Sequence, residues 1–297
     1  MTTFFSKASR LQVGIVVALL FFGCAYIGSW AWSLLIFSSI LVGQGEMTQL
    51  LKGKGVKPSQ VIIVSSTILM MGMASLNMPQ FLPPILTMSA IASFFRLLFR
   101  KEKAGINDIG GTLLAVIYLS YLPSHVILLR HLGEHFPQTA LLPHWQQPGL
   151  HALVFLLSVV AASDIAAYYV GKAFGKHLLA EAISPKKTQE GAIAGLVAGM
   201  LFAWITTLIW PFPWEHALIL SVLLVATGQL GDLTESMMKR DAGLKDSGEI
   251  LASHGGFLDR ADSYIFSSVV CYYYIYWIIE KQGLAPEVIY WFRHLGS

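Results

Sequence analysis

The hydrophobic positions of this chain come in long blocks, and short polar stretches separate the blocks. An α-helix rises 1.5 Å per residue, so about twenty apolar residues cross the ~30 Å hydrocarbon core of a bilayer. Nine runs come near that length, and they predict an all-α, polytopic integral membrane protein with about nine transmembrane helices. The predicted spans are residues 11–28, 29–51, 61–77, 78–99, 108–129, 149–172, 191–210, 214–233 and 263–280.

Two local features refine these boundaries. Gly28 and Ser29 alone separate the first two spans. Pro79, Pro83 and Pro84 stand near the start of the fourth span, and a proline removes a backbone donor and clashes with the preceding turn. We therefore expect the entry to the fourth span to be kinked or unwound.

The charged residues predict how the chain is oriented. They make up only 12% of the 297 residues, against roughly 25% in soluble domains, and the cytoplasmic loops of membrane proteins collect Lys and Arg. With the N-terminus in the cytoplasm, nine spans place 17 of the 20 cations inside, together with the polar loops 173–190 and 234–262. We expect a multi-pass protein of the inner cell membrane with its C-terminus outside.

Charge and cysteine usage narrow the possible partners. The formal net charge of +3 arises from cations beside the predicted spans, so it favours the anionic headgroups of a lipid bilayer and not nucleic acid. Cys24 and Cys271 each lie inside an apolar run, which excludes a disulfide framework.

Polar residues enter the predicted spans mainly in the second half of the chain. We therefore expect residues 1–148 to form N-terminal membrane helices and residues 149–297 to form the catalytic membrane region. Glu46 and Asp108 are the acidic exceptions in the first half, and we expect both at the membrane interface.

The densest polar segment runs from Gly231 to Asp262 and holds seven of the seventeen Asp and Glu residues. Asp232 and Lys239 share a helical face as one predicted span ends, and Asp259 and Asp262 share a face as the next begins. Carboxylates at the ends of adjacent helices are suited to hold Mg²⁺, which prefers oxygen ligands. Nearby groups suited to phosphates are Lys239, Arg240, Lys245, Arg260, His254, Gly255 and Gly256. A solvated surface loop is the alternative interpretation.

Two further groups of residues are candidates for function. Asp164, Tyr168 and Gly171 share one helical face. An acid inside a span usually faces a cavity or a partner and not lipid. The alternative is that Asp164 simply forms a hydrogen bond to a neighbouring helix.

Ser184, Lys186, Lys187 and Thr188 precede a predicted helix whose free N–H groups suit an anion. An ordinary basic loop closed by a Thr188 cap explains that segment equally well.

The polar segment resembles the signature of the phosphatidate cytidylyltransferase (CDP-diacylglycerol synthase) family, S-x-x-K-R-x4-K-D-x-G followed by H-G-G-x-x-D-R-x-D. The matching positions here are Ser236, Lys239, Arg240, Lys245, Asp246, Gly248, His254, Gly255, Gly256, Asp259, Arg260 and Asp262. The preceding Gly231–Ser236, the Asp164–Gly171 face and the Ser184–Gly191 segment also resemble the family, and the resemblance is detailed over roughly 160–280.

This resemblance implies the reaction of CTP with phosphatidate to give CDP-diacylglycerol and pyrophosphate, with Mg²⁺ and a homodimer. It makes Asp232 and Asp259 metal ligands, with Asp262 as a further ligand and Asp246 as support. The expected phosphate-binding side chains are Lys239, Arg240, Lys186, Lys187 and Arg260, with Ser184, Thr188 and Ser236 orienting the phosphates and with Asp164 and Tyr168 lining the cavity beneath. Whether a second, monovalent ion accompanies Mg²⁺ stays open.

Two other functions remain as alternatives. A CTP-dependent lipid kinase acting on a polyprenol would release CDP instead of pyrophosphate. An ion-coupled transporter would use Asp164 and Asp232 near broken helices, but it predicts an internal repeat, and the sequence has none.

Overall fold

The computed structural model describes residues 10–99, 105–132, 148–209, 213–244, 248 and 256–280. These residues are mostly helical, with one two-stranded antiparallel sheet among them. Five of the described helices are long and apolar enough to cross a membrane, and their bounds are Ser29–Gly53, Ile106–Arg130, Pro148–Phe174, Gln189–Leu208 and Trp214–Asp241. Each predicted span corresponds to a helix, but nine membrane crossings are not confirmed.

The chain forms two compact units, and each is described by itself. Unit 1 comprises Met1–Leu128 and Gly231–Ile265, and unit 2 comprises Leu129–Leu230 and Phe266–Ser297. The division expected at residue 148 concerns function, and it stays a prediction.

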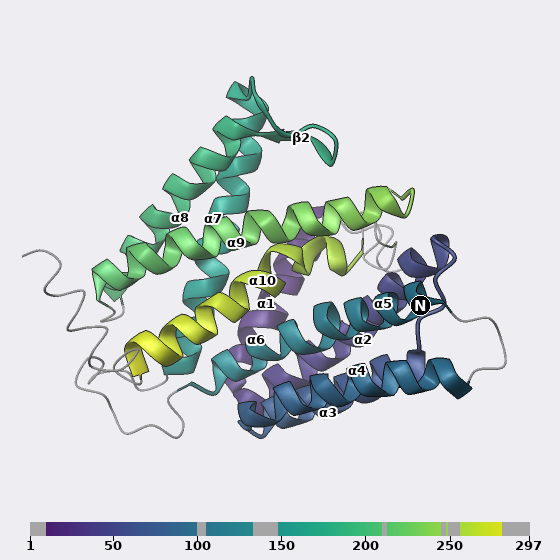
Figure 1. The fold of residues 1–297 in the computed structure, drawn as a ribbon. Coiled ribbons are helices and arrows are strands. Elements are labelled where there is room, and N and C mark those ends of the chain that lie inside the picture. The colour runs from purple at the N-terminus through teal and green to yellow at the C-terminus, as the bar shows by residue number, and fades with distance from the viewer. Residues whose placement is uncertain are drawn as a thin grey trace, which may run out of the picture. The chain divides into compact units, whose positions relative to one another are not determined.

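Unit 1 contains the N-terminal helices and the facing ends of two later ones. Its elements are α1 (Arg10–Ile27), α2 (Ser29–Gly53), α3 (Gln60–Ser75), η1 (Pro79–Phe81), α4 (Leu82–Phe99), α5 (Ile106–Val116), η2 (Ile117–Tyr121), most of α6 (Leu122–Arg130), the end of α9 (Trp214–Asp241) and the start of α10 (Leu258–Tyr274). Figure 1 shows α2, α3, α4 and α5 as a bundle of long helices.

Both expected boundaries in unit 1 are confirmed. Gly28 separates α1 from α2 with a φ of 142°, which a side chain rarely permits. The fourth predicted span begins with the 3-10 turn η1 at Pro79, and only then does α4 follow. The prolines therefore unwind its entry as the sequence indicates.

Buried hydroxyl and amide groups join the helices of unit 1. Gln44 of α2 donates to Thr67 of α3, and the hydroxyls of Thr67 and Ser120 lie 2.7 Å apart. Ser66 of α3 and Ser89 of α4 are joined in the same way at 2.6 Å. Such bonds contribute about 0.6 kcal/mol each on average between membrane helices. They fix which faces of these apolar helices meet.

Unit 2 is built around two closely packed helices and a hairpin. Its elements are α7 (Pro148–Phe174), β1 (Leu178–Ala180), β2 (Ser184–Thr188), α8 (Gln189–Ile209), the first part of α9, the second part of α10 and η4 (Ile275–Glu280). The β1–β2 hairpin lies beyond the ends of α7 and α8 (Figure 1).

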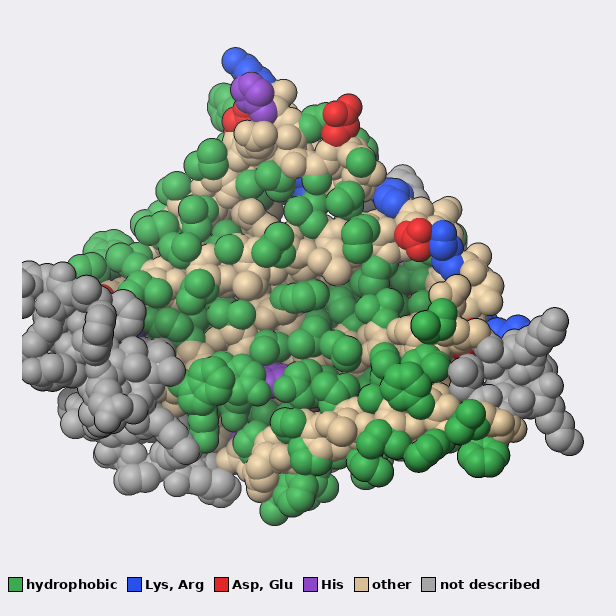
Figure 2. All heavy atoms as spheres, in the orientation of Figure 1, with side chains coloured by type: hydrophobic (Ala, Val, Ile, Leu, Met, Phe, Trp, Pro, Cys, Tyr) green, Lys and Arg blue, Asp and Glu red, His purple; other side chains and the backbone are tan. Residues whose placement is uncertain are grey.

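Glycines allow α7 and α8 to approach closely. Gly191 and Gly195 stand four residues apart on α8, and a Cβ at each would come within 2.7 Å of Ala167 O and 2.8 Å of Ser163 Oγ on α7. Gly199, four residues further on, makes room for α9, because a Cβ there would lie 2.5 Å from Val225 Cγ2. Small residues at this spacing are typical of membrane helix pairs. Figure 2 shows hydrophobic side chains over the visible flank of α8, while the coloured charges of unit 2 gather at the hairpin end.

Candidate active site

The end of α9 presents a row of polar side chains on one face. Asp232, Glu235, Ser236 and Lys239 follow helical spacing, and Glu235 is fully buried while Ser236 and Lys239 are each 8% exposed. The helix continues beyond the predicted end of the span at residue 233 and stops at Asp241. The first part of the expected loop is therefore helical.

Gly243 explains where α9 ends. Its φ is 72°, its N–H donates to Arg240 O at 3.0 Å, and the N–H of Leu244 donates to Lys239 O at 2.8 Å. This pair of bonds around a left-handed glycine is a Schellman motif, which satisfies the last carbonyls of a helix. The motif terminates α9 just after its polar row.

The start of α10 brings a second acidic group to this row. Asp259 lies in the first turn of α10, where it accepts hydrogen bonds from Gly256 N at 2.8 Å and from Lys239 Nζ. Asp262, one turn later, is 8% exposed and accepts from Ser263 N at 2.7 Å. The two helices of unit 1 thus meet through a lysine and an aspartate, whereas a metal held between their carboxylates stays a prediction.

Lys239 sits between carboxylates. Its ammonium forms ion pairs with Glu235 and Asp259, and Asp232 is also close enough to Glu235 to act on it electrostatically. Ser236 Oγ lies 3.5 Å from Asp232 Oδ1. We call Asp232, Glu235, Lys239, Asp259 and Asp262 the acid–lysine cluster.

Tyr118 is a buried residue within electrostatic reach of the acid–lysine cluster. This tyrosine is 2% exposed and stands in the π-turn η2 between α5 and α6, and π-turns inside helices are frequent at functional sites. All four carboxylates of the cluster act electrostatically on its hydroxyl. The sequence gives no signal for Tyr118, because nothing local distinguishes it from other apolar-span aromatics.

The donor chemistry of the cluster fits Mg²⁺ in part. In the described part of the chain no three Asp, Glu, His or Cys side chains are arranged to hold a metal. Mg²⁺ usually needs only one or two carboxylates, with water and substrate phosphates completing its shell. Oε1 of the fully buried Glu235 accepts no hydrogen bond from the described residues, so the cluster retains unused acceptor capacity.

The remaining residues predicted in the polar segment 231–262 divide into two groups. Arg240 and Arg260 are exposed, and Arg240 donates to Leu244 O at 3.1 Å. Lys245, Asp246, His254 and Gly255 lie outside the described residues.

Unit 2 holds the other predicted site residues. Asp164 and Tyr168 are exposed on α7, with Lys172 Nζ 5.9 Å from the centre of the Tyr168 ring. Ser184, Lys186, Lys187 and Thr188 form most of β2, where Lys186 is exposed and the other three are half-buried. The expected meeting of these residues with the acid–lysine cluster stays a prediction.

Thr188 caps the N-terminus of α8, which is one of the two interpretations that the sequence allows for this residue. Its Oγ1 accepts from Gly191 N at 3.2 Å and so caps α8. A Cβ on Gly171 or Gly175 would come within 2.9 Å of the Thr188 hydroxyl, so both glycines make room for the cap. Its expected contact with phosphate stays a prediction.

Glu190 fastens the hairpin to the start of α8. Its carboxylate accepts from Lys176 N at 3.1 Å and lies 2.6 Å from His177 Nδ1. The Glu190 carboxylate therefore ties the connection between α7 and the hairpin to the first turn of α8.

The two acids of the first half, Asp108 and Glu46, both have hydrogen-bond partners in unit 1. Asp108 is half-buried and binds Lys57 N at 2.7 Å and Gly105 N at 3.3 Å. Glu46 is only 2% exposed and therefore buried inside unit 1, while its expected position at the membrane interface stays a prediction. The signal available in the sequence was an acid inside an apolar run, which is costly unless it has a partner.

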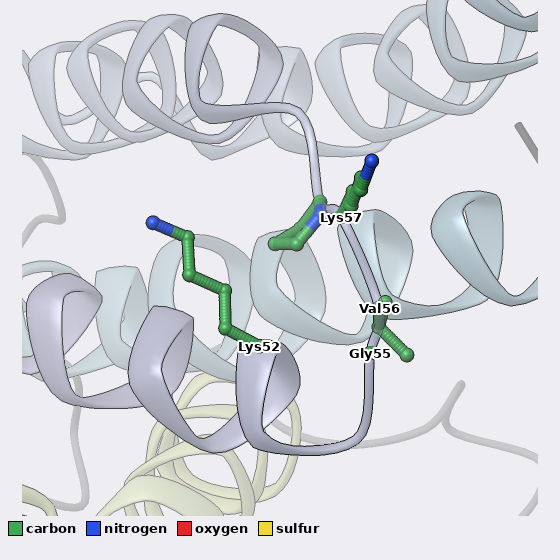
Figure 3. Close-up of a pocket in the computed structure, with 5 residues that line it drawn as sticks. Lys52, Gly55, Val56 and Lys57 are labelled. Carbon is green, nitrogen blue, oxygen red and sulfur yellow. The ribbon is translucent and has the colours of Figure 1, made fainter. Parts of the chain in front are cut away.

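A pocket of about 420 Å³ lies at the connection between α2 and α3, and its lining residues are Lys52, Gly55, Val56, Lys57 and Pro58. Lys52 extends from the last turn of α2 and Lys57 from the connecting segment, with their amine ends apart (Figure 3). Two ammonium groups at the end of a membrane-length helix favour contact with anionic lipid headgroups.

The described residues form a mostly helical protein with five helices that could span a membrane, and the acid–lysine cluster lies among them. The sequence model of the cytidylyltransferase family matches residues 8–278, and the chain belongs to this family of nucleotidyltransferases. The resemblance described above is thereby confirmed.

Proteins with this similarity occur in bacteria and plants. A phosphatidate cytidylyltransferase of Synechocystis is 36% identical over 281 residues, which are 89% of this chain and 93% of that protein. One of Bacillus subtilis is 31% identical over 273 residues, or 89% and 96%. Chloroplastic phosphatidate cytidylyltransferase 4 of Arabidopsis thaliana is 33% identical over 304 residues, or 94% and 76%. These names favour neither a polyprenol kinase nor a transporter.

Proposed function

We propose that this chain transfers the cytidylyl group of CTP to phosphatidate, giving CDP-diacylglycerol and pyrophosphate. The observation that carries the proposal is the acid–lysine cluster. The proposal is supported by the phosphatidate cytidylyltransferases of Synechocystis and Bacillus subtilis, which match this chain over most of their length. The product serves phospholipid biosynthesis.

The reaction needs alignment and charge neutralisation more than a strong base. An oxygen of the lipid phosphate, already ionised near neutral pH, attacks the α-phosphorus of CTP. The new P–O bond forms as the α–β phosphoanhydride bond breaks, and pyrophosphate leaves with that electron pair. A phosphoryl transfer of this kind is accelerated by holding the reactants in line and by neutralising the equatorial oxygens.

The chain's residues divide that work. One or two of the carboxylates of Asp232, Asp259 and Asp262 would hold Mg²⁺, with water and substrate phosphates completing its shell, and when bound this ion would neutralise phosphate charge and polarise the α-phosphorus. Lys239 is paired with Glu235 and Asp259, which hold its ammonium group in the cluster, and it would neutralise a phosphate oxygen there. Ser236 lies one turn from Asp232 and would orient the same phosphates.

Residues outside the acid–lysine cluster complete the proposal. Lys186, Lys187, Arg240, Lys245 and Arg260 would bind phosphates, Ser184 and Thr188 would orient them, and Asp164 and Tyr168 would line the cavity. Asp246 would support the ion, while His254, Gly255 and Gly256 would allow close approach of the backbone to CTP.

The membrane placement follows from the same chemistry. Diacyl chains remain in the bilayer, and CTP is cytoplasmic, so the N-terminus and both polar loops would face the cytoplasm of the inner cell membrane. We propose a homodimer, which the mass of the purified protein in detergent would test.

The product that leaves CTP tests the function. Purified protein receives CTP labelled in the base and in the γ-phosphate, together with phosphatidate, in the presence of Mg²⁺ or of a chelator. Labelled CDP-diacylglycerol and pyrophosphate, formed only with Mg²⁺, are the expected result. Release of CDP with a polyprenol acceptor would identify a kinase instead, and no consumption of CTP would contradict both enzymes.

A further inference from the structure

Glu46 of α2 lies far in sequence from the polar segment but contacts its C-terminal end directly. Oε1 accepts a hydrogen bond from Phe257 N at 2.8 Å, and Oε2 accepts one from Leu258 N at 2.9 Å. Both donors are backbone N–H groups at the N-terminus of α10, where a helix leaves its first N–H groups unsatisfied. A single carboxylate thus caps α10 with both of its oxygens.

The cap is built into the packing of unit 1. Glu46 is 2% exposed and Leu258 fully buried. Gly43, one turn earlier on α2, leaves the space that Phe257 occupies, because a Cβ there would come within 2.9 Å of the Phe257 ring. Glu46 therefore does not reach α10 by chance from a mobile surface position.

Glu46 also touches the other end of the segment that precedes α10. A Cβ on Gly248 would lie 2.8 Å from Oε1 and 3.0 Å from Cγ of Glu46. One side chain therefore contacts residues on both sides of 249–255. Only a glycine fits at position 248 while the carboxylate keeps its place.

The next residue along α10 makes this cap relevant to catalysis. Asp259 directly follows Leu258, and its oxygens bind Lys239 Nζ and Gly256 N. A shift of the first turn of α10 would move Asp259 relative to Lys239 and Asp232 on α9. A misplacement of about 1 Å at reacting groups can cost roughly 100-fold in rate.

We infer that Glu46 is a positioning residue of the acid–lysine cluster, holding the first turn of α10, and with it Asp259, in register with α9. This inference rests on the proposed function. It assigns to the first half of the chain a part in a site whose sequence signature lies entirely in the second half. Glu46 itself acts through backbone N–H groups and touches no reacting atom.

Glu46→Gln tests the inference with little change of shape. The amide keeps one acceptor but places an N–H₂ group against a backbone donor, so one of the two bonds to α10 is lost. Glu215→Gln is the matched control, because Glu215 is an exposed residue in the first turn of α9. Folded protein is quantified by thermal unfolding in detergent, and activity is measured well below the midpoint.

Two readouts decide the outcome. The first is hydrogen exchange of the peptide covering Phe257 and Leu258, which we expect to become faster in Glu46→Gln and to stay unchanged in Glu215→Gln. The second is kcat per folded molecule, which we expect to fall about 10- to 100-fold with a much smaller change in KM for CTP. A purely structural role would lower the midpoint but leave kcat per folded molecule unchanged.

Each other result overturns the inference. A kcat per folded molecule equal to that of Glu215→Gln would show that Glu46 only stabilises the fold. A lower kcat with unchanged exchange at Phe257 and Leu258 would show that Glu46 acts by another route. If Glu46→Gln does not fold, Glu46→Asp, which keeps the charge but shortens the reach, is judged by the same two readouts. Failure of the wild-type protein to make CDP-diacylglycerol would instead refute the proposed function.

Discussion

Lys239 balances two carboxylates in a buried part of unit 1. It is 8% exposed, and its two ion-pair partners are Glu235, which is fully buried, and Asp259. Removing one partner of a buried ion pair leaves the other charge uncompensated in a poorly solvated place. The stability of the cluster and its proposed chemistry therefore depend on the same ammonium group. Substitutions can separate the effect on stability from the effect on CTP turnover.

Lys239→Met should destabilise the protein by about 3 kcal/mol, because Glu235 keeps a buried charge without its cation. The double variant Glu235→Gln/Lys239→Met should regain much of that stability, since the buried charge is gone, yet it should remain unable to turn over CTP. Unfolding midpoints in detergent and CTP consumption provide the two measurements. A double variant no more stable than Lys239→Met would show that Glu235 is not the stranded charge.

Asp232→Asn and Asp259→Asn should each lower CTP turnover by about 100-fold or more, because an amide is a poor ligand for Mg²⁺ and carries no charge. The amount of protein in the membrane should stay the same, since Asn has nearly the shape of Asp and carries no charge that would oppose insertion. Turnover is measured at saturating CTP and phosphatidate, with membrane content measured by quantitative blot. Full activity in both variants would end the assignment of these aspartates as ligands.

At the scale of elements, the close packing of α7 against α8 requires glycine, which has no side chain, at positions such as Gly195. A Cβ on Gly195 would come within 3.0 Å of the Ser163 carbonyl and 2.8 Å of its hydroxyl, and a backbone atom cannot move aside as a flexible side chain can. The hairpin with Lys186 and Lys187 follows α7 and precedes α8. The close packing of α7 against α8 therefore fixes the two points at which the hairpin is attached.

Gly195→Ala should destabilise unit 2 by roughly 1–3 kcal/mol through overpacking. Gly72→Ala in α3 is the matched control, because nothing lies within 4 Å of a Cβ there, and it should be neutral or slightly stabilising as alanine favours helix. Thermal unfolding of the two variants in the same detergent compares them. Equal midpoints would mean that α7 and α8 are not in the contact described.

The sequence predicts the elements better than their contacts. The break at Gly28 and the unwound entry at Pro79 follow from local backbone chemistry, and both are present. The extension of α9 to Asp241 was missed because its charged residues suggest a loop, whereas their helical spacing places Asp232 and Lys239 on one face.

The candidate site shows the same limit. Lys239 and Asp259 are predictable as neighbours, because each stands at the end of a helix in one motif, and their ion pair is present. Glu46 and Tyr118 are not predictable, because their relation to the motif exists only through packing between helices distant in sequence. Long-range pairing of this kind leaves no periodic trace in a single sequence.

At the scale of the whole molecule, charge predicts which loops share one side of the membrane. Lys54 at the end of α2 pairs with Asp241 at the end of α9 at 2.9 Å within unit 1, so those two helix ends must lie on one side. Lys186 of the unit 2 hairpin belongs to the same predicted cytoplasmic group, whereas Glu215 at the other end of α9 belongs outside.

Single cysteines in a background without Cys24 and Cys271 test this sidedness. Cysteines replacing Lys186 or Asp241 should react with a membrane-impermeant thiol reagent only after the cells are opened, and a cysteine replacing Glu215 should react in intact cells. The reason is that a hydrated probe cannot cross ~30 Å of hydrocarbon. Labelling of Lys186→Cys in intact cells would place the basic hairpin away from the cytoplasm, where CTP could not reach it, and would therefore contradict both the predicted topology and the assignment of Lys186 and Lys187 to CTP.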